Sequence, residues 1–410
     1  MKKFTVLIFL YLTFCSISYS RPQYSILQSF GTKCQNCHIN TQGGGIRNNP
    51  GWLSRKDISL ISPKSIGLGN FFDFIGKSNT FIDDKITFGF DIRYQSARWP
   101  GPTDSNKIAT KRDNMLMQAT PYLAIRPFDW MELEGQYNVA YDLEENKRYI
   151  GQQPFTSSMY LRIAEDLPTL RIGKFQPTIG TKFDDHTYLV RQVGTEISRT
   201  PLIPDDYAEW GAQLEFEKLN WLGVTLGVFS SKYLSELQPV KNKNGTSTPI
   251  VDVNQPTTVI RVGIYPETKS CNTFFGGYYL FNSGGSVNDK GEFNNYFYIG
   301  NLFFNIGISD QFAIMTEYMR SYKHNARSTN NFLLEVNYQV MDPINVFVRG
   351  ERANTEDKFT QKVYHNNQLV IGTHIFPLPF IDLLAEYRIY EREAIQDFSA
   401  QWAIQLHIFY

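Results

Sequence analysis

The sequence predicts an all-β protein, an antiparallel transmembrane β-barrel of about 16 strands with a short N-terminal segment inserted as a plug. Two observations predict this fold. From about residue 86 to residue 410, segments of about ten residues alternate apolar and polar side chains. Short turns and longer loops also alternate along this region, as they do when a barrel has turns at one end and loops at the other.

The alternation gives each predicted strand one apolar face for lipid and one polar face for the lumen. In the first strand, Phe88, Phe90 and Ile92 alternate with Gly89, Asp91 and Arg93. The same period recurs at residues 131–142, 208–216 and 381–389. A soluble sandwich or propeller would mix its loop lengths and gather its aromatic residues into one shared core. The barrel is therefore the favoured interpretation.

The connections set the orientation of the predicted barrel. Short turns are expected near residues 127–129, 165–168, 218–220, 309–310, 341–343 and 377–379. Longer loops are expected near residues 100–112, 143–153, 178–206, 232–255, 283–294, 321–329, 353–361 and 391–396. With an even number of strands, both termini lie at the turn end, which is periplasmic in bacterial outer membranes. The last strand ends on Tyr410, similar to the aromatic C-terminal signal of bacterial barrels.

The first 85 residues differ from the rest of the chain. Residues 1–20 have a basic start, a short apolar stretch and small residues before the expected cleavage site, which predicts a signal peptide. Residues 21–85 then form a haem-bearing segment and residues 86–410 the barrel. No later apolar run is long enough for a transmembrane helix. The 40 basic and 40 acidic residues balance, so the composition does not indicate nucleic acid as a partner.

Cys34-Gln35-Asn36-Cys37-His38 is the attachment signature of c-type haem. We expect Cys34 and Cys37 to form the two thioether bonds and His38 to be the proximal iron ligand of one covalent haem c. A thioredoxin-like dithiol would need a βαβ context, and a zinc site would need a second pair of Cys or His ligands nearby. The fourth cysteine, Cys271, is expected to be an inert thiol.

The segment around the motif is too short and polar to enclose a haem alone. Residues 40–52 are expected to be extended and rich in turns, without amphipathic helices. Arg47, Arg55 and Lys56 are candidate partners of the haem propionates. The barrel lumen would then exclude water from the haem.

The distal ligand would also come from the barrel, since no Met occurs between residues 21 and 114. His186 is the first candidate, because it lies in the third and longest loop, which in such barrels often folds into the lumen. His407, on the lumen face of the last strand, is the second. His374 is expected to face inward at the same end, and Met315 and Met319 inward near the outer end. A five-coordinate haem is a further alternative.

A signal peptide, one Cys-x-x-Cys-His motif near the mature N-terminus and a barrel of about 16 strands resemble the fused monohaem cytochrome–porins of bacterial outer membranes. The best-known members of that family are iron oxidases. The resemblance implies electron transfer between an extracellular donor, with Fe(II) as the candidate, and a periplasmic c-type cytochrome. It leaves open whether the protein is an enzyme. Acidic residues of the third loop are candidate contacts for a cationic donor: Asp184, Asp185, Asp205 and Asp206.

Two other functions remain open at this stage. One is a conduit that carries electrons outward to extracellular acceptors, since direction depends on potentials and partners. The other is a diffusion porin in which the haem segment is a gate or redox sensor. Predicted lumen charges of both signs fit either a water-filled pore or a bound plug: Arg93, Arg126, Arg162, Arg349, Glu132, Glu215, Glu335 and Glu386.

Overall fold

The structure is a computed structural model. It describes residues 33–40, 45–100, 110–140, 155–164, 167–180, 188–194, 199–203, 207–236, 240–241, 247–248, 251–266, 271–284, 296–309, 311–324, 326–358, 360–393 and 397–410. The predicted signal peptide, His186 and the four aspartates of the third loop lie outside the described residues.

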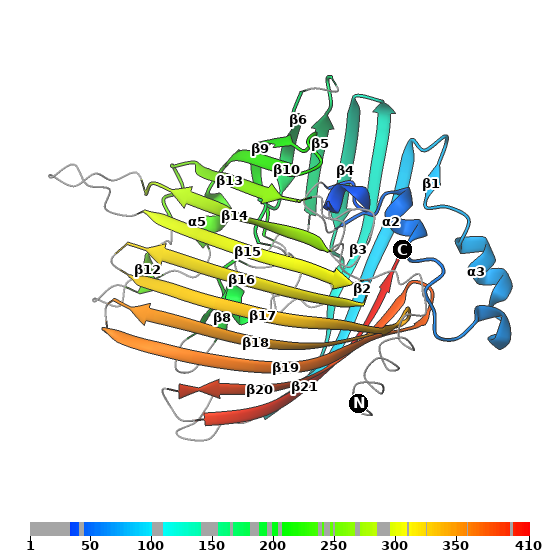
Figure 1. Cartoon of the computed structure of the whole chain (residues 1–410). Helices are drawn as coiled ribbons and strands as arrows, with labels where there is room; N and C mark the ends of the chain where they lie inside the picture. Colours follow the sequence, from blue (N-terminus) through cyan, green and yellow to red (C-terminus); the bar gives the residue numbers. More distant parts are fainter. Residues whose placement is uncertain are drawn as a thin grey trace, which may run out of the picture.

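The described chain forms a closed antiparallel β-barrel of sixteen strands, which confirms the predicted fold class (Figure 1). The barrel closes because β2 pairs with both β3 and the last strand, β21. A short strand, β1 (Thr80–Phe81), adds to the start of β2. The barrel strands are β2 (Ile86–Pro100), β3 (Thr110–Phe128), β4 (Met131–Tyr137), β5 (Phe155–Leu161), β6 (Thr169–Phe175), β9 (Glu209–Phe216), β10 (Leu222–Phe229), β13 (Thr257–Ile264), β14 (Asn272–Asn282), β15 (Phe297–Ser309), β16 (Phe312–Lys323), β17 (Arg327–Met341), β18 (Ile344–Asp357), β19 (Lys362–Leu378), β20 (Ile381–Arg392) and β21 (Asp397–Phe409).

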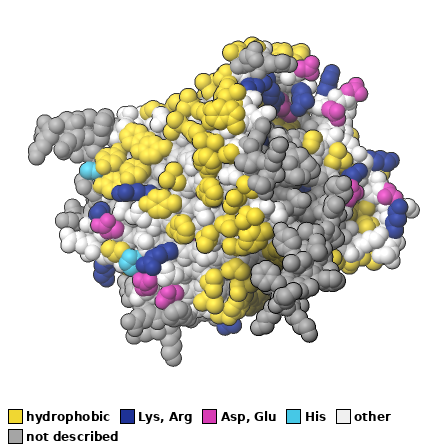
Figure 2. Space-filling view, viewed as in Figure 1, with side chains coloured by type: hydrophobic (Ala, Val, Ile, Leu, Met, Phe, Trp, Pro, Cys, Tyr) yellow, Lys and Arg dark blue, Asp and Glu magenta, His cyan; other side chains and the backbone are white. Residues whose placement is uncertain are grey.

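The alternation of side chains gives the wall an apolar outer face and a polar inner face, as predicted. On β15, Leu302 is 63% exposed on the outside, whereas its neighbours Asn301 and Phe303 are each 3% exposed and face inward. Figure 2 shows hydrophobic side chains spread across the visible wall, with charged side chains gathered toward its ends. Arginines and glutamates of the wall are instead buried on the lumen side, as the alternation predicts.

The two ends of the barrel are not as different as predicted. The turn end has short connections at residues 129–130, 217–221, 342–343 and 379–380, and it also holds the C-terminal residue. At the loop end, however, strands extend into three of the predicted longer loops. The pairs Lys323↔Arg327, Asp357↔Lys362 and Arg392↔Asp397 shorten the predicted loops at residues 321–329, 353–361 and 391–396. Backbone hydrogen bonding persists here beyond the apolar band, where the side-chain pattern no longer reveals it.

Short elements outside the wall complete the described chain. They are η2 (Cys34–Asn36), α2 (Asn49–Leu53), η3 (Pro63–Ile66), α3 (Gly69–Ile75), η4 (Leu189–Arg191), β7 (Gln192–Gly194), β8 (Arg199–Pro201), α5 (Lys232–Glu236), β11 (Val240–Lys241) and β12 (Ser247–Thr248). Across the described residues, none of the helices has the length and apolar character needed to cross a membrane. The extended, turn-rich strip expected at residues 40–52 ends instead in the short helix α2, which Asn48 caps by accepting a hydrogen bond from the Gly51 N–H at 3.0 Å.

The third loop folds into the lumen at residues 188–194, as expected. Helix η4 contacts the inner face of β16, β17, β18 and β19, and the β7–β8 hairpin continues from it. Asn331 of β17 donates hydrogen bonds to the carbonyls of Leu189, Val190 and Gln192 at 2.8–3.1 Å. The loop therefore lies across the barrel interior and is held there by side chains of the wall.

Candidate functional site: the Cys34–His38 turn at the barrel mouth

The cysteine motif forms a tight turn. The backbone N–H groups of Cys37 and His38 both donate to the Cys34 carbonyl, at 3.1 and 2.9 Å. The chain then doubles back, since His38 pairs with Arg47 in an antiparallel bridge and the Asn48 N–H donates to the Cys37 carbonyl at 3.1 Å. The motif therefore sits at the base of a hairpin, with all three of its functional residues within one turn.

Helix α2 packs directly on this turn through a glycine. A Cβ added at Gly51 would lie 1.9 Å from the Cys37 carbonyl oxygen, so any side chain there would force the two segments apart. The Asn48 side chain also donates to the Gln35 carbonyl at 3.0 Å. The sequence after the motif thus braces the motif, which its glycine-rich composition alone did not reveal.

The barrel holds this segment across its turn end. On one side, Lys33 Nζ donates to the carbonyls of Glu217 and Leu219 at 2.8 and 2.6 Å, in the turn between β9 and β10. On another side, Ile39 and Ile46 pack with inward-facing residues of β3 and β5: Tyr122, Ala124 and Tyr160. Farther along, Trp52 and Ile58 pack with Phe376 of β19, Phe380 of the following turn and Phe409 of β21. The segment therefore spans the mouth of the barrel from β9 to β21.

The environment of the motif fits a covalent haem better than a redox-active dithiol. Cys34 and Cys37 are free cysteines that keep some accessible surface. Burial raises the pKa of both thiols, whereas redox-active dithiols have a lowered pKa. Burial, aided by Arg47, lowers the pKa of His38 to about 4, so its imidazole is neutral. The neutral imidazole is the form that binds a metal, and the buried Nδ1 of His38 has no hydrogen-bond partner among the described residues.

Two of the candidate distal ligands, His407 and His374, face the lumen, and each is already bonded to an aspartate. His407 faces the lumen near the turn end, as expected, but its Nε2 lies 2.8 Å from Asp91 Oδ1 on β2. Iron ligation through Nε2 would have to break this contact. His374 also faces inward, with its Nδ1 2.9 Å from Asp382 Oδ2. His186 lies outside the described residues, so its candidacy as a ligand stays a prediction.

One expectation about the methionines is wrong. Met315 does face inward, but β16 starts at Phe312, so Met315 lies near the turn end and not near the outer end. It belongs to a buried cluster with Tyr265, Phe274, Phe303 and Ala313. Lys33 Nζ lies 5.3 Å from the centre of the Tyr265 ring, so this cluster borders the segment that carries the motif. The expectation placed Met315 at the wrong end of its strand, because β16 begins at the turn end and runs toward the loop end.

Two of the three predicted propionate partners, Arg47 and Arg55, lie close to the motif. The guanidinium of Arg47 is 4.6 Å from the centre of the Phe409 ring, and that of Arg55 is 5.8 Å from the Phe376 ring. Both arginines act electrostatically on Cys37. They are therefore held on aromatic surfaces at the mouth, within reach of the motif.

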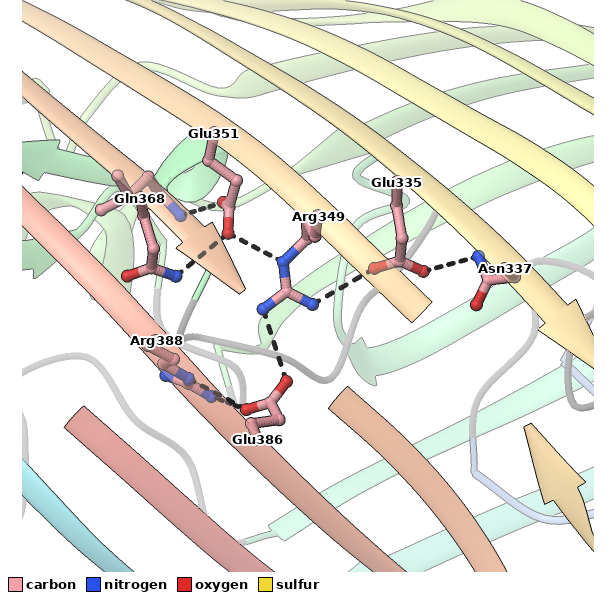
Figure 3. Close-up of polar contacts among 8 residues, drawn as sticks. Glu335, Asn337, Arg349, Glu351, Gln368, Glu386 and Arg388 are labelled. Carbon is pink, nitrogen blue, oxygen red and sulfur yellow. Dashed lines mark hydrogen bonds and ion pairs between the residues drawn. The ribbon is translucent and has the colours of Figure 1, made fainter. Parts of the chain in front are cut away.

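A second charged cluster lies near the middle of the barrel wall (Figure 3). Arg349 Nε lies 2.8 Å from Glu351, Nη1 lies 3.2 Å from Glu335, and Nη2 lies 3.5 Å from Glu386. Arg388 pairs with Glu386 as well. The Arg349 guanidinium also stacks on Tyr188 of the third loop, 3.9 Å from the ring centre. Sequence reasoning named Arg349, Glu335 and Glu386 as lumen charges, and the alternation over residues 381–389 places Arg388 on the same polar face. It missed Glu351, which the same alternation places on the lumen face.

The comparisons with known proteins concern the fold. No protein-family model matches the chain, and no curated protein matches its sequence. Among solved structures, OmpT of Vibrio cholerae has a TM-score of 0.51 at 11% identity, covering 81% of this chain and 100% of its own. The outer membrane channel DcaP of Acinetobacter baumannii has a TM-score of 0.52 at 7% identity, with 79% and 97% covered. OprB of Pseudomonas putida has a TM-score of 0.51 at 8% identity, with 87% and 99% covered. The chain thus has the fold of an outer-membrane porin.

Proposed function

We propose that this protein is an outer-membrane electron-transfer barrel that carries one covalent haem c at its periplasmic mouth. Cys34 and Cys37 would hold the haem and His38 would ligate its iron. The observation that carries the proposal is that the Cys34–His38 turn is braced by Asn48 and Gly51 and held across the barrel mouth by Lys33. A motif kept by chance would not need this support.

When bound, a covalent haem supplies one-electron redox chemistry. The residues of this chain would orient and shield it. Burial keeps His38 neutral and therefore able to ligate. Ile39 and Ile46 turn an apolar surface toward Tyr122 and Tyr160, which removes water from that side of the segment. Arg47 and Arg55 supply positive charge for the propionates.

We place the two proposed electron-transfer partners at opposite ends of the barrel. With both termini periplasmic, the turn end would face a soluble c-type cytochrome, and the third loop would separate the haem from the outside. An extracellular donor, with Fe(II) as the candidate, would approach from the loop end. Measuring the reduction potential and the rate of haem reduction by Fe(II) tests the donor. A haem that is inert to Fe(II) and to other external donors would remove the oxidase function.

Covalent attachment is tested first. We expect the wild-type protein, produced with the c-type maturation machinery, to retain haem after denaturing electrophoresis, and a peptide containing residues 34–38 to gain the mass of one haem. Cys34→Ser and Cys37→Ser together should abolish the retained haem. Cys271→Ser is the matched control and should keep it. Wild-type protein that folds but gains no covalent haem, beside a cytochrome that matures in the same cells, would refute the proposal.

A diffusion porin with a haem-bearing gate is the second candidate, and the channel fold favours it. The two functions predict different currents in planar bilayers. A plugged conduit should show little steady conductance until the segment or the third loop is displaced. Large, steady open currents from the haem-loaded protein would contradict the conduit and support the porin.

A further inference from the structure

The segment at residues 60–82, called the rim segment here, carries apolar side chains on its surface. Phe74 is 71% exposed, Ile82 68% and Phe71 56%. The other apolar residues of the rim segment that are at least 41% exposed are Leu60, Ile61, Ile66, Leu68 and Phe81. A water-soluble surface rarely leaves so many large apolar groups together, so this surface indicates a binding partner.

The rim segment is fixed in place despite this exposure. Phe72 and Ile75, on one face of α3, pack against the cluster around Trp52. The Tyr410 hydroxyl donates to the carbonyls of Ile75 and Ser78 at 2.8 and 3.0 Å. The backbone N–H groups of Leu60 and Ile61 donate to the carbonyls of Phe376 and Pro377, near the end of β19, at 2.8 and 3.1 Å. The exposed phenylalanines therefore have a defined direction, set by the barrel.

The exposed apolar surface of the rim segment is continuous with the outer surface of the barrel wall. Strand β1 pairs with β2 so that Phe81 lies beside Ile86, on the side from which Phe88 faces outward. Figure 1 shows α3 outside the barrel wall at the end that also holds the C-terminus. Phe128 and Trp130, whose rings stack 5.3 Å apart, are exposed at the same end, where barrels carry an aromatic girdle.

The charges in and beside the rim segment balance, with Lys64, Lys77 and Lys85 against Asp73, Asp83 and Asp84, which fits the zwitterionic headgroups of a phospholipid surface. Lys64 and Lys85 are exposed, and Lys77 Nζ lies 5.8 Å from the centre of the Phe74 ring. Lysines beside buried aromatic groups can keep their ammonium groups at the level of lipid phosphates. Asn70 and Asp73 occupy the remaining face of α3, so the helix has separate apolar, polar and barrel-facing sides.

We propose that the rim segment is an interfacial anchor that lies in the headgroup region of the periplasmic leaflet, with Phe71, Phe74 and Phe81 inserted toward the acyl chains. The occupant of this surface is phospholipid, because the surface is continuous with the lipid-facing wall of the barrel. The inference rests on the outer-membrane location proposed above and is independent of the haem.

A tryptophan reporter tests the position. Phe74→Trp and Phe81→Trp are reconstituted separately, as full-length protein produced both with and without the haem-maturation machinery, into phosphatidylethanolamine–phosphatidylglycerol vesicles with ordinary or brominated acyl chains. The ratio of emission in the two lipids cancels any constant quenching inside the protein. We expect the emission that each substitution adds over the parent to be lost in brominated lipid. Asp73→Trp, on the polar face of α3, is the matched control and should keep its added emission.

The outcomes distinguish the occupants. Added emission that is insensitive to brominated lipid but quenched by acrylamide in water would overturn the proposal, because the phenylalanines would then face the periplasm. Emission insensitive to both quenchers would also overturn it and indicate a protein partner or a second copy of the chain. Two reporters on separate elements keep the test valid if one variant fails to fold. A failure to bind haem would leave the result unchanged.

Discussion

The third loop and the N-terminal segment both enter the lumen, yet the barrel holds them by different means. Both regions are buried by apolar packing, around Val190 in the loop and around Ile46 and Trp52 in residues 33–58. In the loop, wall side chains also bond to the backbone of residues 188–194: those of Asn331, Glu351 and Thr355. In the N-terminal segment the bonds run the other way, since the Lys33 side chain donates to backbone carbonyls of the turn between β9 and β10.

This difference predicts which substitutions act on which region. Changes on the inner wall should release the loop and leave the Cys34–His38 turn in place. Changes within residues 33–58 should displace the turn and leave the loop in place. Four variants, taken from the largest expected effect to the smallest, test this separation.

Arg349→Met should have the largest effect. Arg349 is buried among three glutamates, and removing its charge breaks its ion pairs with Glu335 and Glu351, although Glu386 keeps Arg388. Breaking a buried pair costs about 3–5 kcal/mol. Contact with Tyr188 is lost too, so conductance should rise. The temperature at which the barrel loses its folded electrophoretic mobility measures stability. Arg352→Met, which breaks the exposed pair with Glu393, is the control and should cost less than about 1 kcal/mol. Equal shifts for both variants would contradict a structural role of the cluster.

Asn331→Ala should free the third loop more selectively. Three carbonyls of the loop lose their donor, at a cost of about 1–3 kcal/mol for buried polar groups left unpaired. We expect faster proteolysis within residues 188–203 and larger bilayer currents, with haem content unchanged. Asn330→Ala removes an outward-facing neighbour bonded to Tyr318 and should alter neither. Haem loss in Asn331→Ala would show that the two regions are not separate.

Gly51→Ala should displace the haem turn. The new Cβ overlaps the Cys37 carbonyl, and overpacking of this kind costs about 1–3 kcal/mol. We expect a lower yield of covalent haem at normal barrel stability. Gly135→Ala, where a Cβ meets nothing within 4 Å, is the matched control. An unchanged haem yield would mean that α2 does not brace the motif.

Glu217→Gln should have the smallest effect, seen mainly in its pH dependence. Burial raises the pKa of Glu217 above 4.5, although Lys33 acts in the opposite direction. The folded protein therefore holds this proton more tightly than the unfolded chain, and the free energy of unfolding falls as the pH rises from 4.5 through the raised pKa. The substitution should remove that decline in a pH series of unfolding midpoints. Lys33→Met should destabilise the segment more, because it also removes two bonds to carbonyls. A stability that rises over this pH range in the wild type would contradict the sign.

Much of the wall could be predicted because its rule is local. In a strand each side chain alternates between lipid and lumen, so one stretch of sequence is enough to place Asp91, Arg349 or His407 inward. The haem motif is local as well, because five consecutive residues contain both thiols and the imidazole. The lengths of the loops at residues 321–329 and 353–361 were mispredicted because a local rule cannot detect hydrogen bonds between polar strands, which leave no alternating pattern of side chains.

The sequence by itself thus determined the barrel, its inward and outward faces and the Cys34–His38 motif, because each depends on neighbouring residues. The tertiary structure alone decided which distant groups meet. Closure of the first strand on the last places His407 against Asp91, 316 positions away, and the strand directions bring Met315 to the mouth. Docking on Tyr410 likewise turns the phenylalanines of the rim segment outward. Such contacts depend on the register and closure of the whole barrel, which no single segment contains.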